Sequence, residues 1–185
     1  MRARFDLCRL GVPAVFLIAL VCGRDAFAFE RQWHVGVDGG YAALFEGAAS
    51  GFGGGAHAAY GLSDAFNAMI ELDVTHHPSA SVTLGPANAE KTFSLDTVAS
   101  GGAGLAYTID IARAVPYVGV LAAGYYLGEL SPMSPGGQLA LGLDYQLERN
   151  WAVGAQVRLH TIFTADAGTI AYMTTFLRFE YIWGF

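Results

Sequence analysis

The chain has 185 residues, the size of a single domain, and no linker-like stretch divides it. Hydrophobic residues make up 54% of the chain and charged residues only 14%, alongside 24 glycines and 13% aromatic residues, which is an unusual mixture for a water-soluble core. The formal net charge of −6 argues against nucleic acid as a partner. This composition favours a protein that is surrounded by lipid.

The first 28 residues have the pattern of a cleaved secretory signal peptide. Three arginines precede an apolar run over residues 10–22, and Ala26-Phe27-Ala28 then offers an A-x-A cleavage site. The run is shorter than the roughly 20 apolar residues that a membrane helix needs. We therefore expect residues 1–28 to be removed and residues 29–185 to form one β-barrel domain.

The signal segment also contains both cysteines of the chain, Cys8 and Cys22. The mature chain is thus expected to form neither a disulfide nor a cysteine metal site. Removing four arginines and two aspartates from the 10 basic and 16 acidic residues leaves six and 14, a net charge of −8. The mature chain is therefore more acidic than the precursor.

After the signal, apolar and polar residues alternate with a period of two in blocks of about ten residues, the length that a tilted strand needs to cross a bilayer. No mature segment is apolar for long enough to form a membrane helix. The blocks lie at about 32–43, 52–61, 66–76, 93–107, 116–127, 137–147, 151–163 and 171–185. In lipid such strands must close on themselves, because an open edge leaves backbone groups unsatisfied. We predict an all-β fold, an eight-stranded antiparallel transmembrane up-and-down β-barrel.

The alternation also predicts which side chains face the lumen. Apolar rows should contact lipid and polar rows should point inward. The charged residues on the predicted inward faces are Asp38, Glu71, Asp73, Asp96, Asp144, Arg158, Arg178 and Glu180. Within block 93–107, Phe93, Leu95 and Tyr107 are expected outside and Ser94 and Asp96 inside. Blocks 52–61 and 116–127 are dominated by glycine, alanine and tyrosine, so alternation does not decide their facing.

Aromatic residues gather where the blocks should meet the periplasmic interface, as in a girdle at headgroup depth. These residues are Trp33, Tyr60, Phe66, Tyr107, Tyr117, Tyr145, Trp151, Tyr181, Trp183 and Phe185. The last block shows the pattern best, because an apolar row that ends in aromatics lies opposite a row that contains Arg178 and Glu180. Such a strand is typical of lipid outside and a polar lumen inside.

Several stretches, Tyr60-Gly61-Leu62-Ser63-Asp64, the segment 115–120, Gly142-Leu143-Asp144-Tyr145 and the terminal 181–185, resemble the superfamily of small eight-stranded outer-membrane barrels that includes outer-membrane proteins A, X and W. The resemblance implies a bacterial outer membrane, both termini in the periplasm, and outer-membrane lipids and lipopolysaccharide as neighbours. It also implies an insertion signal, read by the barrel assembly machinery, formed by Phe179, Tyr181, Trp183 and Phe185. Members of the superfamily range over anchors, adhesins, narrow channels and lipid-modifying enzymes.

Three motifs could carry chemistry, and each has a structural interpretation that we prefer. Residues 51–56 match the G-x-G-x-x-A dinucleotide fingerprint, but no βαβ unit surrounds them, which favours a glycine-rich strand. His76 and His77 lack a third metal ligand at a recognisable spacing, so we expect solvated loop residues. His160 and Thr161 are similar to a segment of the lipid A deacylases, yet Ile162 occupies the position of the serine nucleophile.

The inward charges predict one further feature. Counted from the periplasmic strand ends, five of them share a layer, and we expect these to form a charge cluster across the lumen. They are Asp38, Glu71, Arg158, Arg178 and Glu180. The cluster has two interpretations: polar groups that pair with each other and with water, which we favour, or a gate or selectivity element.

The expected function is a structural or interaction role in the outer membrane, with a narrow channel for very small solutes as an option. We expect no enzyme activity, no cofactor, no metal and no nucleic acid. The alternative is a lipid-active enzyme of the lipid A deacylase or acyltransferase type, which would need a nucleophile and a base near the extracellular rim.

Overall fold

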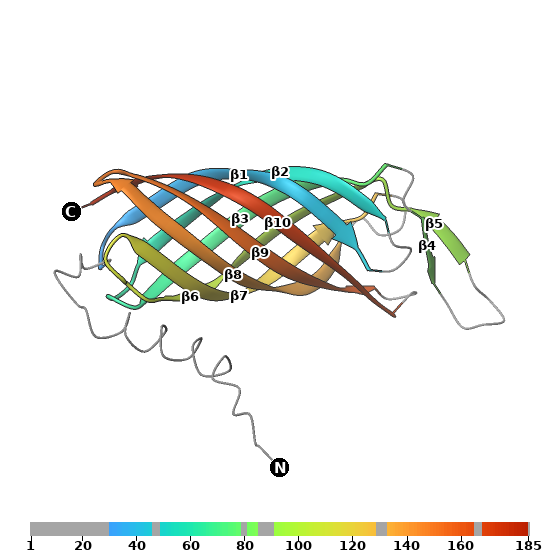
Figure 1. Cartoon of the computed structure of the whole chain (residues 1–185). Coiled ribbons are helices and arrows are strands. Elements are labelled where there is room, and N and C mark those ends of the chain that lie inside the picture. The colour runs from blue at the N-terminus through green and yellow to red at the C-terminus, as the bar shows by residue number, and fades with distance from the viewer. Residues whose placement is uncertain are drawn as a thin grey trace, which may run out of the picture.

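The computed structural model describes residues 30–45, 49–78, 81–84, 91–128, 133–164 and 168–184. The predicted signal segment and Phe185 lie outside these residues. Eight antiparallel strands form a closed barrel in which chain neighbours pair and the first strand meets the last (Figure 1). They are β1 (Trp33–Leu44), β2 (Ser50–Gly61), β3 (Phe66–His76), β6 (Thr97–Thr108), β7 (Ala114–Tyr126), β8 (Ser134–Glu148), β9 (Trp151–Thr164) and β10 (Gly168–Trp183). The predicted fold class is confirmed.

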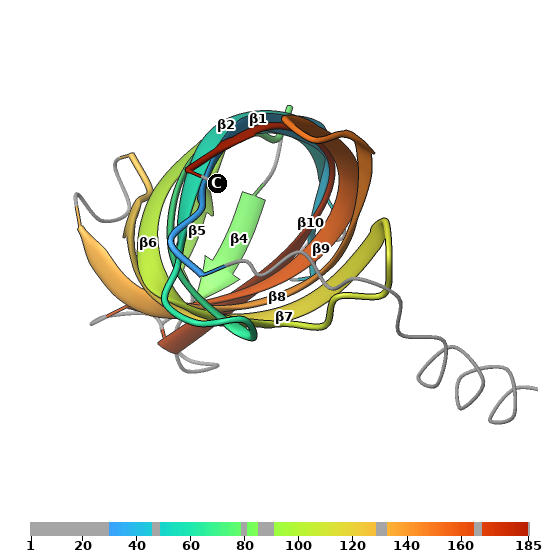
Figure 2. The same ribbon diagram turned by 90° about the vertical axis from the view of Figure 1, so that its left-hand side faces the viewer.

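The register between β1 and β10 brings the two ends of the barrel sequence together. Trp33 pairs with Trp183, and at the other end of the strands Leu44 pairs with Tyr172. We call the end with Trp33 and Trp183 the terminal end, which faces the viewer in Figure 2, and the opposite end the loop end. Two short strands, β4 (Ser81–Leu84) and β5 (Lys91–Ser94), pair with each other and extend beyond the loop end (Figure 1).

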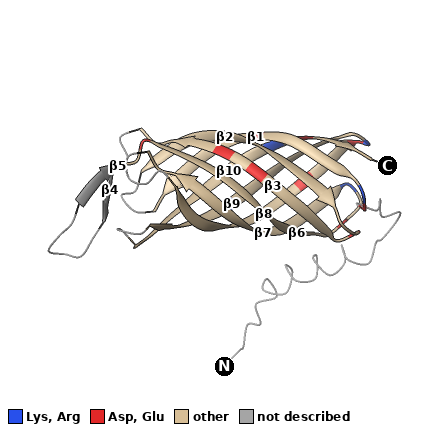
Figure 3. Ribbon diagram, turned by 180° about the vertical axis from the view of Figure 1, so that it is seen from behind, with Lys and Arg blue, Asp and Glu red and all other residues tan. Residues whose placement is uncertain are grey.

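Exposure alternates along the strands because successive side chains of a strand point to opposite faces. On β10, Leu177 is 73% exposed whereas Phe176 before it is fully buried. Most of the barrel wall is free of charged residues, and a few charged segments interrupt the strands midway along the barrel (Figure 3). The described residues include no helix that is long and apolar enough to cross a membrane.

The lumen divides into three layers along the barrel axis. At the loop end lies an apolar cluster that we call the loop-end plug, formed by Leu44, Leu95, Val98, Tyr125, Leu127, Ile162, Ile170 and Tyr172. Charged side chains fill the middle of the barrel. A small cavity lies at the terminal end, between residues near the starts and ends of the strands. The lumen is therefore packed shut on one side of the charged layer and partly hollow on the other.

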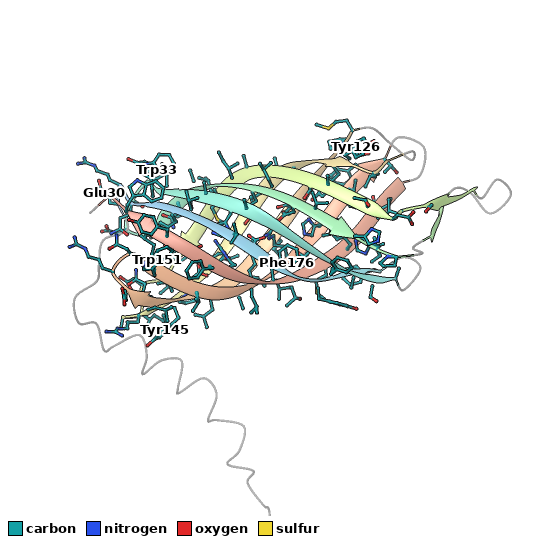
Figure 4. The ribbon with its side chains drawn as sticks, turned by 90° about the horizontal axis from the view of Figure 1, so that it is seen from above. Glu30, Trp33, Tyr126, Tyr145, Trp151 and Phe176 are labelled. Atoms are coloured by element: carbon teal, nitrogen blue, oxygen red, sulfur yellow. The ribbon has the colours of Figure 1, made fainter. Side chains whose placement is uncertain are left out.

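Aromatic residues gather at the terminal end as predicted, with one exception. Figure 4 shows Trp33, Tyr145 and Trp151 at this end of the barrel and Tyr126 at the other. The ring centroids of Trp33 and Tyr60 are 4.8 Å apart. Tyr117, however, is only 7% exposed and lies inside the lumen, so its place in the girdle was wrong. The pairing of β7 with its neighbours turns Tyr117 inward. The sequence of this glycine-rich and alanine-rich strand alternates too weakly to reveal this direction.

The expectation for the block at 93–107 was wrong at its start. The barrel strand begins only at Thr97, after the β4–β5 hairpin. Leu95 is 1% exposed and belongs to the loop-end plug instead of facing lipid. Ser94 and Asp96 are exposed, and the Ser94 hydroxyl donates a hydrogen bond to Asp96 (2.8 Å). A hairpin ends just before the barrel strand here. The inward and outward alternation of residues 93–96 therefore does not continue into the strand.

His77 was expected in solvent and is buried. Its Nε2 lies 3.1 Å from the Thr75 hydroxyl, and its ring meets the Tyr172 ring edge-on at 6.3 Å. Burial and the neighbouring His76 lower the pKa of His77, which favours the neutral imidazole. His76 is exposed, as expected, and packs edge-on against Phe52. The two adjacent histidines thus lie on opposite faces of the barrel wall.

Candidate functional site

Arg158 on β9 lies at the centre of the charged layer. It is fully buried, and its guanidinium contacts carboxylates from two other strands. Nη2 lies 3.3 Å from Asp38 Oδ1 on β1, and Nη1 lies 3.0 Å from Glu71 Oε2 on β3. Nη1 also donates a hydrogen bond to Asp73 on β3. One guanidinium therefore serves three carboxylates, which a planar group with five N–H donors can do.

Arg178 on β10 forms a second group closer to the terminal end. Nη2 donates a hydrogen bond to Glu180, two residues along the same face of the strand. Nη1 donates to Gln156 Oε1 (3.3 Å), which also accepts a hydrogen bond from the Tyr117 hydroxyl (2.7 Å). The guanidinium carbon lies 5.0 Å from the centre of the Tyr117 ring. Arg178 is thus held by a carboxylate, an amide and an aromatic face.

His57 on β2 joins the two groups. Its Nδ1 lies 2.9 Å from Asp38 Oδ2, and its Nε2 lies 2.9 Å from Glu180 Oε1. A neutral imidazole carries only one N–H, whereas both partners here are carboxylates. A neutral imidazole between two ionised carboxylates can form only one of these hydrogen bonds. Both form when Asp38, His57 or Glu180 carries one additional proton.

The structure brings the five predicted cluster residues into one connected layer. Asp38 and Glu71 contact Arg158, whereas Glu180 contacts Arg178. Glu71 was expected to reach both arginines, but among the described residues it forms an ion pair with Arg158 and not with Arg178. We use the name central charged layer for Asp38, His57, Glu71, Asp73, Asp144, Arg158, Arg178 and Glu180.

Glycines make room for these contacts between strands. Gly36 pairs with Glu180 on one side and His57 on the other, and the His57 ring crosses the space that a side chain at position 36 would occupy. Gly55 lies in the same way between Asp38 and Asp73. Because the inward face of a narrow barrel is crowded, long polar side chains alternate with positions that have no side chain.

The sequence reasoning missed His57 as a member of the layer. Its block at 52–61 had no decidable facing, and so its direction was left open. A signal was present, since His57 is the one residue of that block that can carry a charge near neutral pH, and Ala56 and Ala58 flank it. Asp73 and Asp144 were predicted to face inward but were not assigned to the cluster, and both are at least nine-tenths buried.

The predicted insertion-signal row lies on the outer face of β10. Phe179, Tyr181 and Trp183 are 45%, 42% and 39% exposed, and Trp151 of the neighbouring strand stacks on Phe179 with ring centroids 5.0 Å apart. The fourth member, Phe185, lies outside the described residues. The described members thus present a continuous aromatic row to the surroundings of the barrel.

The remaining sequence motifs, residues 51–56 and His160, lie in places that fit a structural role. Residues 51–56 form part of β2, and the elements of the described residues include no helix. His160 is 1% exposed, its ring stacks on Tyr172 at 4.0 Å, and its ring nitrogens lie 3.2 Å from the Tyr125 hydroxyl and 3.1 Å from the Thr174 hydroxyl. Within the described ranges, no group of three or more His, Cys, Asp or Glu side chains could hold a metal ion.

The barrel is similar to three solved outer-membrane structures. Neisserial surface protein A is 18% identical, with a TM-score of 0.55 and 85% of this chain and 99% of that one covered. OprG from Pseudomonas aeruginosa is 14% identical, with a TM-score of 0.56 and coverage of 84% and 97%. The N-terminal β-barrel domain of Pseudomonas aeruginosa OprF is 11% identical, with a TM-score of 0.55 and coverage of 83% and 98%. At these identities the likeness is one of fold.

No protein-family model and no curated protein matches the chain.

Proposed function

We propose, from the fold that it shares with solved outer-membrane barrels, that this chain is a bacterial outer-membrane protein with a structural or interaction role. The observation that carries the proposal is the inverted polarity of the barrel. Arg158 and Glu71 are fully buried inside, whereas Val37, Leu72 and Leu177 are 60%, 62% and 73% exposed outside. Water would penalise so large an apolar surface, whereas lipid solvates it.

The connections support an orientation with both termini in the periplasm. Small outer-membrane barrels have short periplasmic turns and longer extracellular loops. The turns at the terminal end are short, at residues 62–65, 109–113 and 149–150. The connection that carries the β4–β5 hairpin extends from the loop end. The terminal end is thus proposed to face the periplasm, and residues 1–28 are proposed to be the signal that directs export.

The filled lumen supports a structural or interaction role over that of a general pore. The central charged layer crosses the barrel through ion pairs between β1, β3 and β9, and the loop-end plug closes it on one side. Small barrels are commonly filled by their own side chains. Any passage is therefore restricted to very small solutes.

The proposed partners are the surrounding lipids, lipopolysaccharide in the outer leaflet, and the barrel assembly machinery during insertion. The aromatic girdle supports lipid contact, because tryptophan and tyrosine rings favour headgroup depth. We propose no catalytic role: His160 is enclosed within the lumen, where a lipid at the outer rim does not reach it. Release of acyl chains from lipopolysaccharide by the purified protein would contradict this part.

Two measurements test the proposal. The first is membrane fractionation combined with protease treatment of whole cells: the protein should be found in the outer membrane, with cleavage near the β4–β5 hairpin and not in the terminal-end turns. The second is planar-bilayer conductance of the purified protein, which should be near the background of the bilayer. Residence in the inner membrane would overturn the location, and large, steady conductance would overturn the closed lumen.

A further inference from the structure

The cavity at the terminal end contains polar groups that the central charged layer does not fully satisfy. The centres of water molecules can occupy about 30 Å³ of it, which is room for about two waters. Apolar side chains, among them Met69, Ala106 and Ile182, line its walls. Asp144, Arg178 and Glu180 also line it, on the side of the charged layer. The cavity therefore combines a narrow apolar wall with a charged floor.

Asp144 is the carboxylate of this floor whose cation lies beyond hydrogen-bond distance. Its Oδ2 is 3.8 Å from Arg178 Nη1, beyond hydrogen-bond distance, because the guanidinium already bonds to Glu180 and Gln156. Its Oδ1 is buried and has no hydrogen-bond partner among the described residues. Asp144 is 9% exposed. A carboxylate removed from water without its own cation costs free energy, and a bound cation would offset this cost.

Asn67 on β3 is a second unsatisfied group in the cavity. It is 5% exposed, and its side-chain oxygen has no hydrogen-bond partner within the described part of the chain. Asn67 and Asp144 reach the cavity from different parts of the barrel wall, since β6 and β7 separate β3 from β8. Two buried acceptor atoms, Asp144 Oδ1 and Asn67 Oδ1, thus belong to residues that line one small space, and neither has a hydrogen-bond donor in the described part of the chain.

We propose that this cavity binds a small linear primary ammonium ion, with its cationic head on Asp144 and its alkyl stem against Met69, Ala106 and Ile182. An ammonium group offers three N–H donors and a positive charge, which suits a floor with a surplus carboxylate. A straight stem suits a cavity of this volume, because the cavity is not enclosed and the far end of the stem can extend out of it. A divalent metal fits less well, because the described residues contain no group of three or more side chains that could hold one.

The test uses the protein purified from membranes in detergent and n-propylammonium as the probe, with binding measured by calorimetry. 1-Propanol has the same shape without the charge, and sodium has the charge without the stem. The key variant is Asp144→Asn, which keeps the shape and removes the charge. The matched control is Asp64→Asn, a change at an exposed carboxylate in a turn of the same end of the barrel.

Propylammonium should bind saturably at one site, and Asp144→Asn should weaken it about tenfold or more, the loss of one charge-assisted hydrogen bond. Asp64→Asn should bind like the unmodified protein. Ala152→Leu, which places a larger side chain in the wall of the cavity, should abolish binding, and it provides a second test should the first variant not fold. Equal binding by the Asp144→Asn protein, by 1-propanol or by sodium would overturn the proposal.

Discussion

His57 on β2 forms a hydrogen bond with Glu180 on β10 across a strand that lies between them, with Nε2 and Oε1 2.9 Å apart. The intervening residue is Gly36 of β1, which pairs with both. A Cβ at position 36 would lie 2.6 Å from His57 Cε1 and 2.7 Å from Nε2. The bridge between the two halves of the central charged layer thus depends on a missing side chain.

Gly36→Ala should therefore destabilise the barrel. The methyl group would overlap both the backbone oxygen of Phe179 and the His57 ring. Displacing the imidazole leaves Glu180 or Asp38 without a buried hydrogen bond, a loss of about 1–3 kcal/mol, to which the backbone overlap adds. The midpoint of urea unfolding in detergent measures it. Gly39→Ala is the control, because its Cβ would meet Gly53 O at 3.4 Å and Gly54 Cα at 3.9 Å, which are ordinary contacts. Equal midpoints for the two variants would show that the bridge does not need this space.

Arg158→Ala should cost more than any other truncation in the lumen. It leaves Asp38, Glu71 and Asp73 without their shared guanidinium, and unpaired buried charges of this kind cost about 3–5 kcal/mol. Thermal unfolding should shift down strongly, and any conductance should rise and favour cations, because three carboxylates remain. Arg113→Ala, at an exposed turn, should leave both properties unchanged. A stable, non-conducting Arg158→Ala protein would contradict the role of the layer.

Leu141→Arg tests the lipid-facing side of the barrel. Leu141 is 49% exposed in the middle of β8. An arginine that points outward at this depth enters the hydrocarbon and lowers the stability of the fold by about 2–4 kcal/mol. Leu62→Arg serves as the comparison, since Leu62 is equally exposed (52%) but lies in a turn at the terminal end. The free energy of unfolding, measured for the protein folded in lipid vesicles, should fall for Leu141→Arg and hardly change for Leu62→Arg. Similar values would mean that no hydrocarbon surrounds β8.

Deletion of Phe185 should reduce insertion into the outer membrane while leaving export intact. The aromatic row of Phe179, Tyr181 and Trp183 faces outward, and Phe185 is predicted to end it. Phe185→Trp keeps an aromatic ring at this position and should insert normally. Folded and unfolded fractions are counted by their different mobility on gels without heating. Normal assembly of the deleted chain would rule out Phe185 as part of the signal.

The sequence by itself determined the number of barrel strands and the facing of those with distinct chemistry on each side. In β3, β9 and β10, charged residues alternate with apolar ones, so one burial pattern satisfies both lipid and lumen. This is why Glu71, Arg158, Arg178 and Glu180 could be placed inside from the sequence alone. The pattern is local, because it depends only on the alternation of neighbouring residues along one strand.

The tertiary structure decided the contacts that depend on register and on positions without chemical contrast. The inward turn of His57 and Tyr117 could not be read from strands of glycine, alanine and tyrosine, because neither face of those strands is distinctly polar. Leu95 became part of the plug because a hairpin broke the alternation before Thr97. Which carboxylate meets which arginine follows from the stagger of tilted strands around a closed barrel, which backbone hydrogen bonds between distant segments set.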